Sequence, residues 1–142
     1  LISTFESTSQ EWTTLNANST GYAEFIIDND GDNTGGDAVK VTLTDTTTQM
    51  SSGTWYNMCA TYNSTSGVMK LYLNGSQVAT TTHSQTGTIT GVEPIRIGGR
   101  SSSTYANDRW IGDIAVVLTY SKELSSTEVT QNWNAYKARY GL

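Results

Sequence analysis

The chain has 142 residues, of which 15% are charged, and a formal net charge of −5. This length suits one domain with a single core, and the low charge content suits strands better than exposed helices. The few Lys and Arg residues are scattered singly and no apolar run approaches the roughly 18 residues that cross a bilayer, so neither nucleic-acid binding nor membrane insertion is expected.

Alternating apolar and polar residues predict two strands in the first half of the chain. The segment 21–28, GYAEFIID, and the segment 37–45, DAVKVTLTD, each place alternate apolar side chains on one face. The aspartate-rich stretch 28–37, DNDGDNTGGD, lies between these segments and is therefore predicted to be a hairpin loop. Trp12 is assigned to a loop that precedes them.

A second group of strands is predicted between residues 54 and 82. Segments 54–63 and 68–75 form an alternating pair joined by NSTSG. Asn74 and Gly75 suit the two central positions of a type I′ turn, which need positive φ angles. The segment 76–82, SQVATTT, is therefore expected to fold back on its predecessor. Cys59 is the only cysteine and is expected to be a small core residue.

The last part of the chain is predicted to add two strands and a helix. A short strand is expected around Ile97, and the segment 110–120, WIGDIAVVLTY, is apolar enough on both faces to be a central strand. Ser125 and Glu128 form an S-x-x-E capping box, which predicts the start of an amphipathic helix of about four turns. Its expected buried stripe is Val129, Trp133, Tyr136 and Tyr140. The predicted fold class is all-β, a two-sheet antiparallel jelly-roll sandwich with one C-terminal α-helix.

Five landmarks in order resemble the laminin-G-like, concanavalin-A-like lectin/glucanase superfamily. They are Trp55 at a strand start, Tyr72 to Gly75, Ile97 with Gly98, Trp110 to Gly112, and Leu124 to Glu128. The resemblance implies one sandwich domain over residues 1–142. Domains of this family usually carry one or two strands before the equivalent of LISTF, so we expect those strands upstream of Leu1, in a longer protein. The chain departs from the family in GDIAVV, where Ala115 stands in place of an acid.

The C-terminal run NWNAYKARYGL is similar to the tail of such domains in virion proteins of marine tailed phages. This resemblance implies a non-catalytic virion surface module, either a capsid decoration or a fibre and adhesion domain, with carbohydrate binding as a further expectation. Two alternatives stay open: a lectin-like module of a secreted protein, and a purely structural capsid or filament building block. The expected location is a virion surface or the extracellular space. The expected partners are other virion or cell-surface proteins, further copies of the chain, and glycans.

The superfamily includes β-glucanases whose E-x-D-x-x-E strand places two carboxylates about 5 Å apart for retaining hydrolysis. None of the six glutamates has that spacing. His83 lies in a Thr-rich segment without a nucleophile at motif spacing and is expected to be a polar surface residue. We therefore expect the chain not to be an enzyme.

The aspartate stretch permits two interpretations. Asp28, Asp30 and Asp32 alternate as in the first half of a calcium loop, and Asp37 is nearby. The EF-hand pattern fails, because its sixth position is Asn33 and not Gly. A calcium site built from side chains and loop carbonyls and a solvated acidic turn both remain open.

Sugar binding needs exposed aromatic rings beside amides, hydroxyls and acids. The candidates in predicted loops are Trp12, Tyr105, Asn107, Asp108 and Arg109. Trp12 and Tyr105 equally suit interface anchors in an oligomer. The other tryptophans are expected to pack in the core or against the helix, on the basis of their alternation: Trp55, Trp110 and Trp133.

Overall fold

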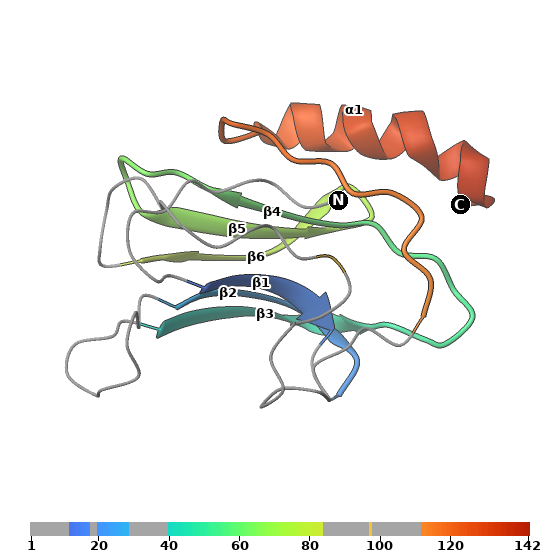
Figure 1. The fold of residues 1–142 in the computed structure, drawn as a ribbon, viewed down its shortest axis with the longest axis horizontal. Coiled ribbons are helices and arrows are strands. Elements are labelled where there is room, and N and C mark those ends of the chain that lie inside the picture. The colour runs from blue at the N-terminus through green and yellow to red at the C-terminus, as the bar shows by residue number, and fades with distance from the viewer. Residues whose placement is uncertain (1–11, 18–19, 29–39, 84–96, 98–111) are drawn as a thin grey trace.

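The computed structural model describes residues 12–17, 20–28, 40–83, 97 and 112–142. Within these residues, two three-stranded antiparallel sheets pack face to face and one α-helix lies outside them (Figure 1). The predicted two-sheet antiparallel sandwich with a C-terminal helix is confirmed. No helix in this part of the chain is long and apolar enough to span a membrane.

The first sheet has the order β1-β2-β3 and consists of β1 (Trp12–Ala17), β2 (Tyr22–Asp28) and β3 (Lys40–Gln49). Asp28 pairs with Lys40, so the predicted hairpin forms, and its loop, residues 29–39, lies outside the described residues. Placing Trp12 in a loop was wrong, because Trp12 opens β1. In WTTLNA the apolar residues are Trp12, Leu15 and Ala17, and only the last two are two positions apart, so period-two alternation did not reveal the whole strand.

A bulge lets β3 continue past its predicted end. The register of β2 against β3 shifts between Tyr22 and Glu24. Asp45 is buried at this point, and its Oδ1 accepts hydrogen bonds from the backbone N–H groups of Thr47 at 2.8 Å and Thr48 at 3.3 Å. A bulge removes backbone groups from the ladder, so the carboxylate replaces the partners that these two groups lose.

The second sheet has the order β4-β5-β6 and consists of β4 (Met58–Tyr62), β5 (Val68–Leu73) and β6 (Ser76–Thr82). Both predicted antiparallel pairings are confirmed. The turn between β5 and β6 has φ angles of 51° at Asn74 and 79° at Gly75. These values are the positive angles that a type I′ turn requires.

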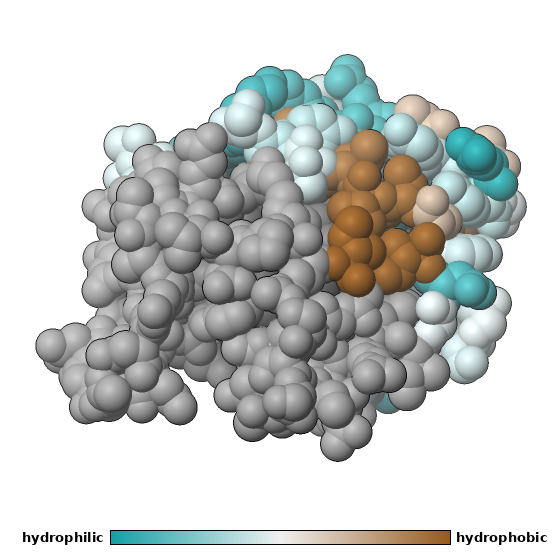
Figure 2. Space-filling view, viewed as in Figure 1, coloured by the Kyte–Doolittle hydropathy of each residue, from teal (hydrophilic) through white to brown (hydrophobic). Residues whose placement is uncertain are grey.

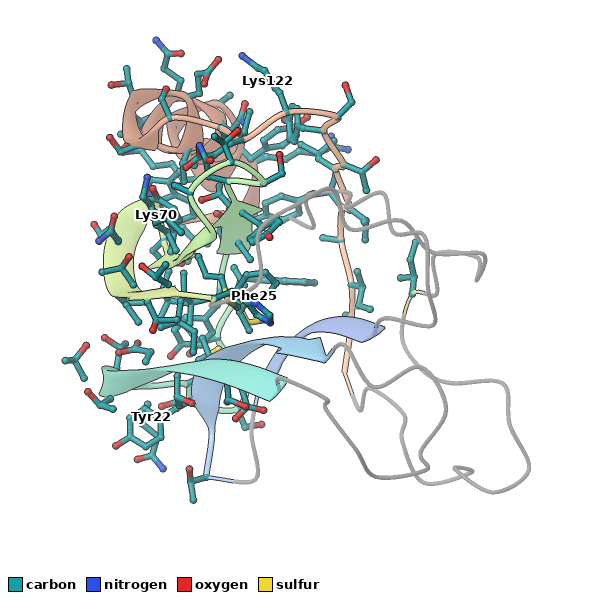
Figure 3. The ribbon with its side chains drawn as sticks, turned by 90° about the vertical axis from the view of Figure 1, so that its left-hand side faces the viewer. Tyr22, Phe25, Lys70 and Lys122 are labelled. Carbon is teal, nitrogen blue, oxygen red and sulfur yellow. The ribbon has the colours of Figure 1, made fainter. Side chains whose placement is uncertain are left out.

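The main core lies between the two sheets. Figure 3 shows Phe25 in this space, and Lys70 on the other face of the second sheet. The core consists of apolar side chains that alternate along their strands: Ala23, Phe25, Leu43, Ala60, Met69, Leu71 and Leu73. Alternation along β2, β3 and β5 therefore predicted the inward face correctly, whereas Cys59, the core residue predicted in β4, belongs to the second core.

The outer face of the second sheet carries a second, smaller core beneath the helix α1 (Ser126–Lys137). It contains Cys59 and Tyr72 from the sheet together with Leu124 and Val129. Cys59 is fully buried, as expected. The predicted capping box at Ser125 is present.

The helix ends earlier than predicted and continues as the 3₁₀-helix η2 (Ala138–Tyr140). Gly141 is the C-cap of η2 and has a φ of 70°. The N–H of Leu142 donates to the carbonyl of Lys137 at 3.0 Å. A left-handed glycine is a common helix end, because it turns the next N–H groups back onto open carbonyls.

The prediction of a central strand over residues 110–120 was wrong for the described part. Residues 113–120 form no strand, and Ile97 likewise lies in a bend. A strand exists only where a neighbour completes its backbone hydrogen bonds, and the six described strands pair among themselves. Ile114 is consequently 45% exposed although its segment is apolar.

Two further side chains lie in the opposite environment to the predicted one. His83 is buried, and its backbone N–H donates to the carbonyl of Gly67 at 2.8 Å. Trp55 was expected to pack in the core or against the helix, but it lies outside the core, is 38% exposed and contacts Tyr140 of η2. The strand β4 begins three residues after Trp55, so the inward alternation of that strand does not reach it.

Candidate functional site

The predicted sites lie at the margin of the described residues or beyond it. Trp12, a sugar-site candidate, and Asp28, a calcium candidate, are direct partners in the β1–β2 ladder. The structure therefore places the backbone of one sugar-site candidate directly opposite the backbone of one calcium candidate. The other candidates fall outside the described residues: Asp30, Asp32, Asp37, Tyr105, Asn107, Asp108 and Arg109. In the described part of the chain, no group of three or more His, Cys, Asp or Glu residues could hold a metal ion.

A contact between two aromatic rings that the sequence did not predict joins the β3–β4 connection to η2, with Trp55 exposed and Tyr140 half-buried. The ring centroids of Trp55 and Tyr140 are 5.6 Å apart and their planes are inclined by 38°. This separation is typical of aromatic rings in contact. We call Trp55 and Tyr140 the aromatic pair.

Hydrogen bonds on both sides of Trp55 define the shape of its loop. The N–H of Ser51 donates to the Tyr56 hydroxyl at 3.0 Å. The N–H of Asn57 donates to Asn74 Oδ1 at 2.9 Å, and the N–H of Asn74 donates to the carbonyl of Asn57 at 2.8 Å. Trp55 is therefore placed two residues from a point that is tied to the β5–β6 turn.

The helix that leads to Tyr140 is held by the same turn. Trp133 packs so closely on Gly75 that a Cβ atom built there would lie 2.5 Å from Trp133 Cδ1. The Thr130 hydroxyl also donates to the carbonyl of Gly75 at 3.1 Å. Only glycine combines this close approach with a φ of 79° at low cost. Both members of the aromatic pair thus depend on one two-residue turn.

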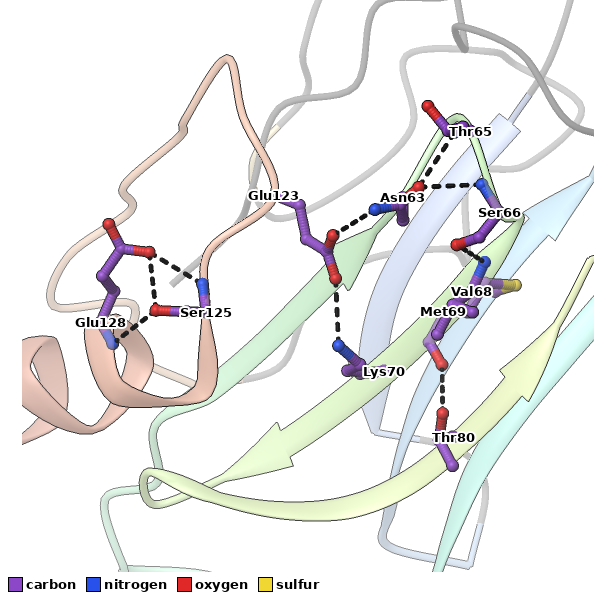
Figure 4. Close-up of polar contacts among 10 residues, drawn as sticks. All are labelled: Asn63, Thr65, Ser66, Val68, Met69, Lys70, Thr80, Glu123, Ser125 and Glu128. Atoms are coloured by element: carbon purple, nitrogen blue, oxygen red, sulfur yellow. Dashed lines mark hydrogen bonds and ion pairs between the residues drawn. The ribbon is translucent and has the colours of Figure 1, made fainter.

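A polar cluster attaches the segment before the helix to the second sheet (Figure 4). Glu123 Oε1 accepts from Lys70 Nζ at 3.1 Å, and its Oε2 accepts from Asn63 Nδ2 at 2.6 Å. Asn63 Oδ1 in turn accepts from the N–H groups of Thr65 and Ser66 and shapes the β4–β5 turn. Both oxygens of Glu123 are therefore engaged in holding the fold.

Glu128 is engaged in a similar way at the helix start. One of its oxygens accepts from the N–H and the hydroxyl of Ser125 and the other from Lys122 Nζ. The Lys122 side chain, followed by these bonds to Ser125, lowers the pKa of Glu128 from 4.5 to about 2. This carboxylate stays ionised and acts as a cap.

The phenol of Tyr72 faces the second core, and burial there raises its pKa above the ordinary value of 10.0. Its hydroxyl therefore stays neutral and cannot serve as a base near neutral pH. Together with the engaged glutamates, this environment gives the outer face of the second sheet a structural role.

The sequence contained one signal for the position of Trp55. The run SSGT, residues 51–54, precedes it and is typical of a turn. This run places Trp55 before the start of β4, where the alternation of apolar residues along the strand does not apply. Contact with Tyr140 could not be inferred, because the two residues lie far apart in the chain and meet only through the tertiary fold.

Comparison with known proteins identifies the family of the chain and finds a matching solved structure. A family model described as the concanavalin A-like lectin/glucanases superfamily matches residues 1–130. No curated protein sequence matches the chain. A matching solved structure is that of an S-layer domain-containing protein from Clostridium thermocellum ATCC 27405, with 17% identity and a TM-score of 0.49. The match covers 89% of this chain and 64% of that chain.

Proposed function

The chain belongs to the concanavalin A-like lectin/glucanases superfamily, and from this premise we propose that it is a non-catalytic, carbohydrate-binding surface module. Family membership is the observation that carries the proposal. The superfamily name joins lectins, which bind sugars, and glucanases, which cleave them, so the fold alone does not choose between the two.

The hydrogen bonds and ion pairs of Glu123 and Glu128 favour sugar binding over sugar cleavage. Retaining hydrolysis needs two carboxyl groups about 5 Å apart, one of them free to attack the sugar and the other free to exchange a proton. Glu123 has both oxygens in an ion pair and a hydrogen bond, and Glu128 has both in its capping contacts. These two carboxylates therefore serve the fold and not a reaction.

We further propose that the module is displayed on a virion, as a capsid decoration or fibre domain, or otherwise outside a cell. The support is the resemblance of residues 132–142 to the tails of phage virion domains. Antibodies raised against the domain should label intact particles or intact cells without permeabilisation. Labelling that needs permeabilisation would contradict display on a surface.

The carbohydrate-binding proposal is tested by a glycan array of the purified protein in millimolar calcium and in EDTA. Specific binding to one class of glycan is the expected result, and silence on every glycan in both conditions would overturn the proposal. The variants Asp30→Asn and Asp32→Asn decide between the two interpretations of residues 28–37. Binding lost in EDTA and in both variants would identify a calcium loop, whereas binding unchanged in all three would identify an acidic turn.

A second candidate function is assembly, in which the domain packs against copies of itself or other subunits. The observation in its favour is the apolar segment 114–118, IAVVL, in which Ile114 is 45% exposed and the last three residues are half-buried. A brown apolar area in Figure 2 lies where this segment runs in Figure 1. Exposed apolar surface of this kind is typical of interaction sites.

Light scattering coupled to gel filtration tests this second candidate. If the segment mediates self-association, the wild-type protein should form an oligomer and Ile114→Ser should shift it towards the monomer. A wild-type monomer at high concentration would remove the support for self-assembly.

A further inference from the structure

We propose that the aromatic pair, Trp55 and Tyr140, is a stacking site for a neutral pyranose ring, an inference that rests on the carbohydrate-binding function proposed above. The apolar C–H face of a pyranose stacks on an aromatic ring, and its hydroxyls stay at the rim, where polar groups and water satisfy them. A ring suited to this role must be exposed and held in place. Trp55 is 38% exposed and lies in contact with Tyr140.

The chemistry around Trp55 favours a neutral sugar. The connection from Met50 to Asn57 contains no charged residue, and its exposed Ser51, Ser52 and Thr54 carry hydroxyls that exchange hydrogen bonds with sugar hydroxyls. Arg139, which precedes Tyr140 in the chain, is exposed. A cation at this position disfavours a cationic sugar, and the choice of a neutral sugar over an anionic one rests on the uncharged loop around Trp55.

The aromatic pair is also organised before a ligand arrives. Trp55 lies on a loop that two hydrogen bonds tie to Asn74, and Tyr140 follows a helix whose Trp133 packs on Gly75. Because adjacent residues of one turn support both rings, their relative position changes little unless that turn moves. Binding then costs little ordering of side chains, and a lower ordering cost raises the affinity.

The inclination of the rings limits the ligand further. Planes that meet at 38° form an angled surface and not one flat platform. We therefore expect a single sugar ring to stack on Trp55 and one or two sugar units to fill the site. We expect short oligosaccharides to bind about as well as long ones.

The test uses fluorescence titration of the full chain with neutral gluco- and galacto-oligosaccharides chosen from the array. The wild-type protein should show a saturable change in tryptophan emission. Trp55→Ala and Tyr140→Ala should each weaken binding by about tenfold or more, as aromatic anchors usually do. Thr65→Ala, in the turn at the other end of β4, is the control and should bind like the wild type.

A conservative variant keeps the proposal testable if either truncation destabilises the fold. Trp55→Phe retains an aromatic face but removes the indole, so it should keep binding within a few-fold on the array and lose the emission change. An emission change that persists in Trp55→Phe would overturn the assignment to this pair, as would full binding by both alanine variants. Those outcomes leave the carbohydrate-binding function intact, whereas a wild-type protein that binds no glycan overturns both.

Discussion

The two faces of the second sheet are covered in different ways. The inner face packs on the first sheet through the buried apolar side chains of Ala60, Met69, Leu71 and Leu73. The outer face mixes polar and apolar side chains, namely Cys59, Thr61, Lys70 and Tyr72, and the helix covers it through Leu124 and Val129. Burial of apolar side chains therefore stabilises the packing of the two sheets on the inner face. A few specific contacts hold the helix on the outer face.

This difference predicts that the two faces respond to different kinds of substitution. A loss of volume should matter most on the inner face, where many atoms contribute a little each. A single clash or a single lost ion pair should matter most on the outer face, where few contacts hold the helix. The four predictions below test this contrast.

The largest effect is expected from Leu71→Ala on the inner face. Leu71 is fully buried in the main core, and removal of its side chain leaves a cavity. The free energy of unfolding should fall by about 2–5 kcal/mol, as measured by urea denaturation. Val129→Ala removes fewer buried atoms beneath the helix and should cost less. An equal or larger loss for Val129→Ala would contradict the contrast between the two faces.

The next effect is expected from Gly75→Ala, which brings a Cβ atom against Trp133. Gly53→Ala is a matched control, because Gly53 has a φ of 78° but no atom within 4 Å of its added Cβ, against 79° and 2.5 Å at Gly75. Both variants carry the strain of a positive φ, so their difference isolates the contact. Gly75→Ala should be less stable than Gly53→Ala by about 1–3 kcal/mol in thermal unfolding. Equal stabilities would show that the helix shifts freely on the turn.

A smaller effect is expected from the ion pair between Lys70 and Glu123. The side chains are 30% and 24% exposed, so water screens the pair only in part. A double-mutant cycle with Lys70→Met and Glu123→Gln should give a coupling energy of about 0.5–1.5 kcal/mol in urea denaturation. A value near zero would leave Asn63 as the main partner of Glu123.

The smallest effect concerns pH and Glu128. Its pKa is about 2 in the folded protein, below the ordinary value of 4.5, so its contribution to stability is complete above pH 4.5. That contribution should disappear as the pH falls from 4.5 towards 2, because the proton binds the unfolded chain more tightly. Melting temperatures of Glu128→Gln should therefore depend less on pH over this interval than those of the wild type. Parallel curves for the two proteins would contradict the pKa assignment.

A contrast between local patterns and tertiary contacts explains how much of the fold could be predicted from the sequence. Alternation along β2 to β5, the Asn74–Gly75 turn and the capping box at Ser125 are local patterns, and each predicted its element. The strand β1 has no such pattern, and residues 113–120 have the composition of a strand but no described partner. Pairing is decided by tertiary structure, so composition alone could not settle either segment.

The candidate site was harder to predict than the fold. Trp55 and Tyr140 were both assigned to packing, because in a sequence an aromatic residue near a strand or helix resembles a core residue. Their contact depends on the Asn57–Asn74 hydrogen bonds and on Trp133 meeting Gly75, which join segments distant in the chain. The residues proposed from composition, such as Asp30 and Tyr105, lie outside the described part and stay predictions.

The two asparagines that support the outer face have a consequence for the choice of expression host. Asn63 and Asn74 each begin an Asn-x-Ser/Thr sequon, which eukaryotic secretory cells glycosylate. The Nδ2 of Asn63 donates to Glu123, and the side chain of Asn74 holds the Trp55 loop. An N-linked glycan is attached to the amide nitrogen, so on Asn63 it would occupy the Nδ2 that donates to Glu123, whereas on Asn74 it would leave the accepting Oδ1 in place and add bulk beside the β5–β6 turn. Production in bacteria leaves both amides unmodified, whereas a secretory host would yield a mixture of modified and unmodified chains.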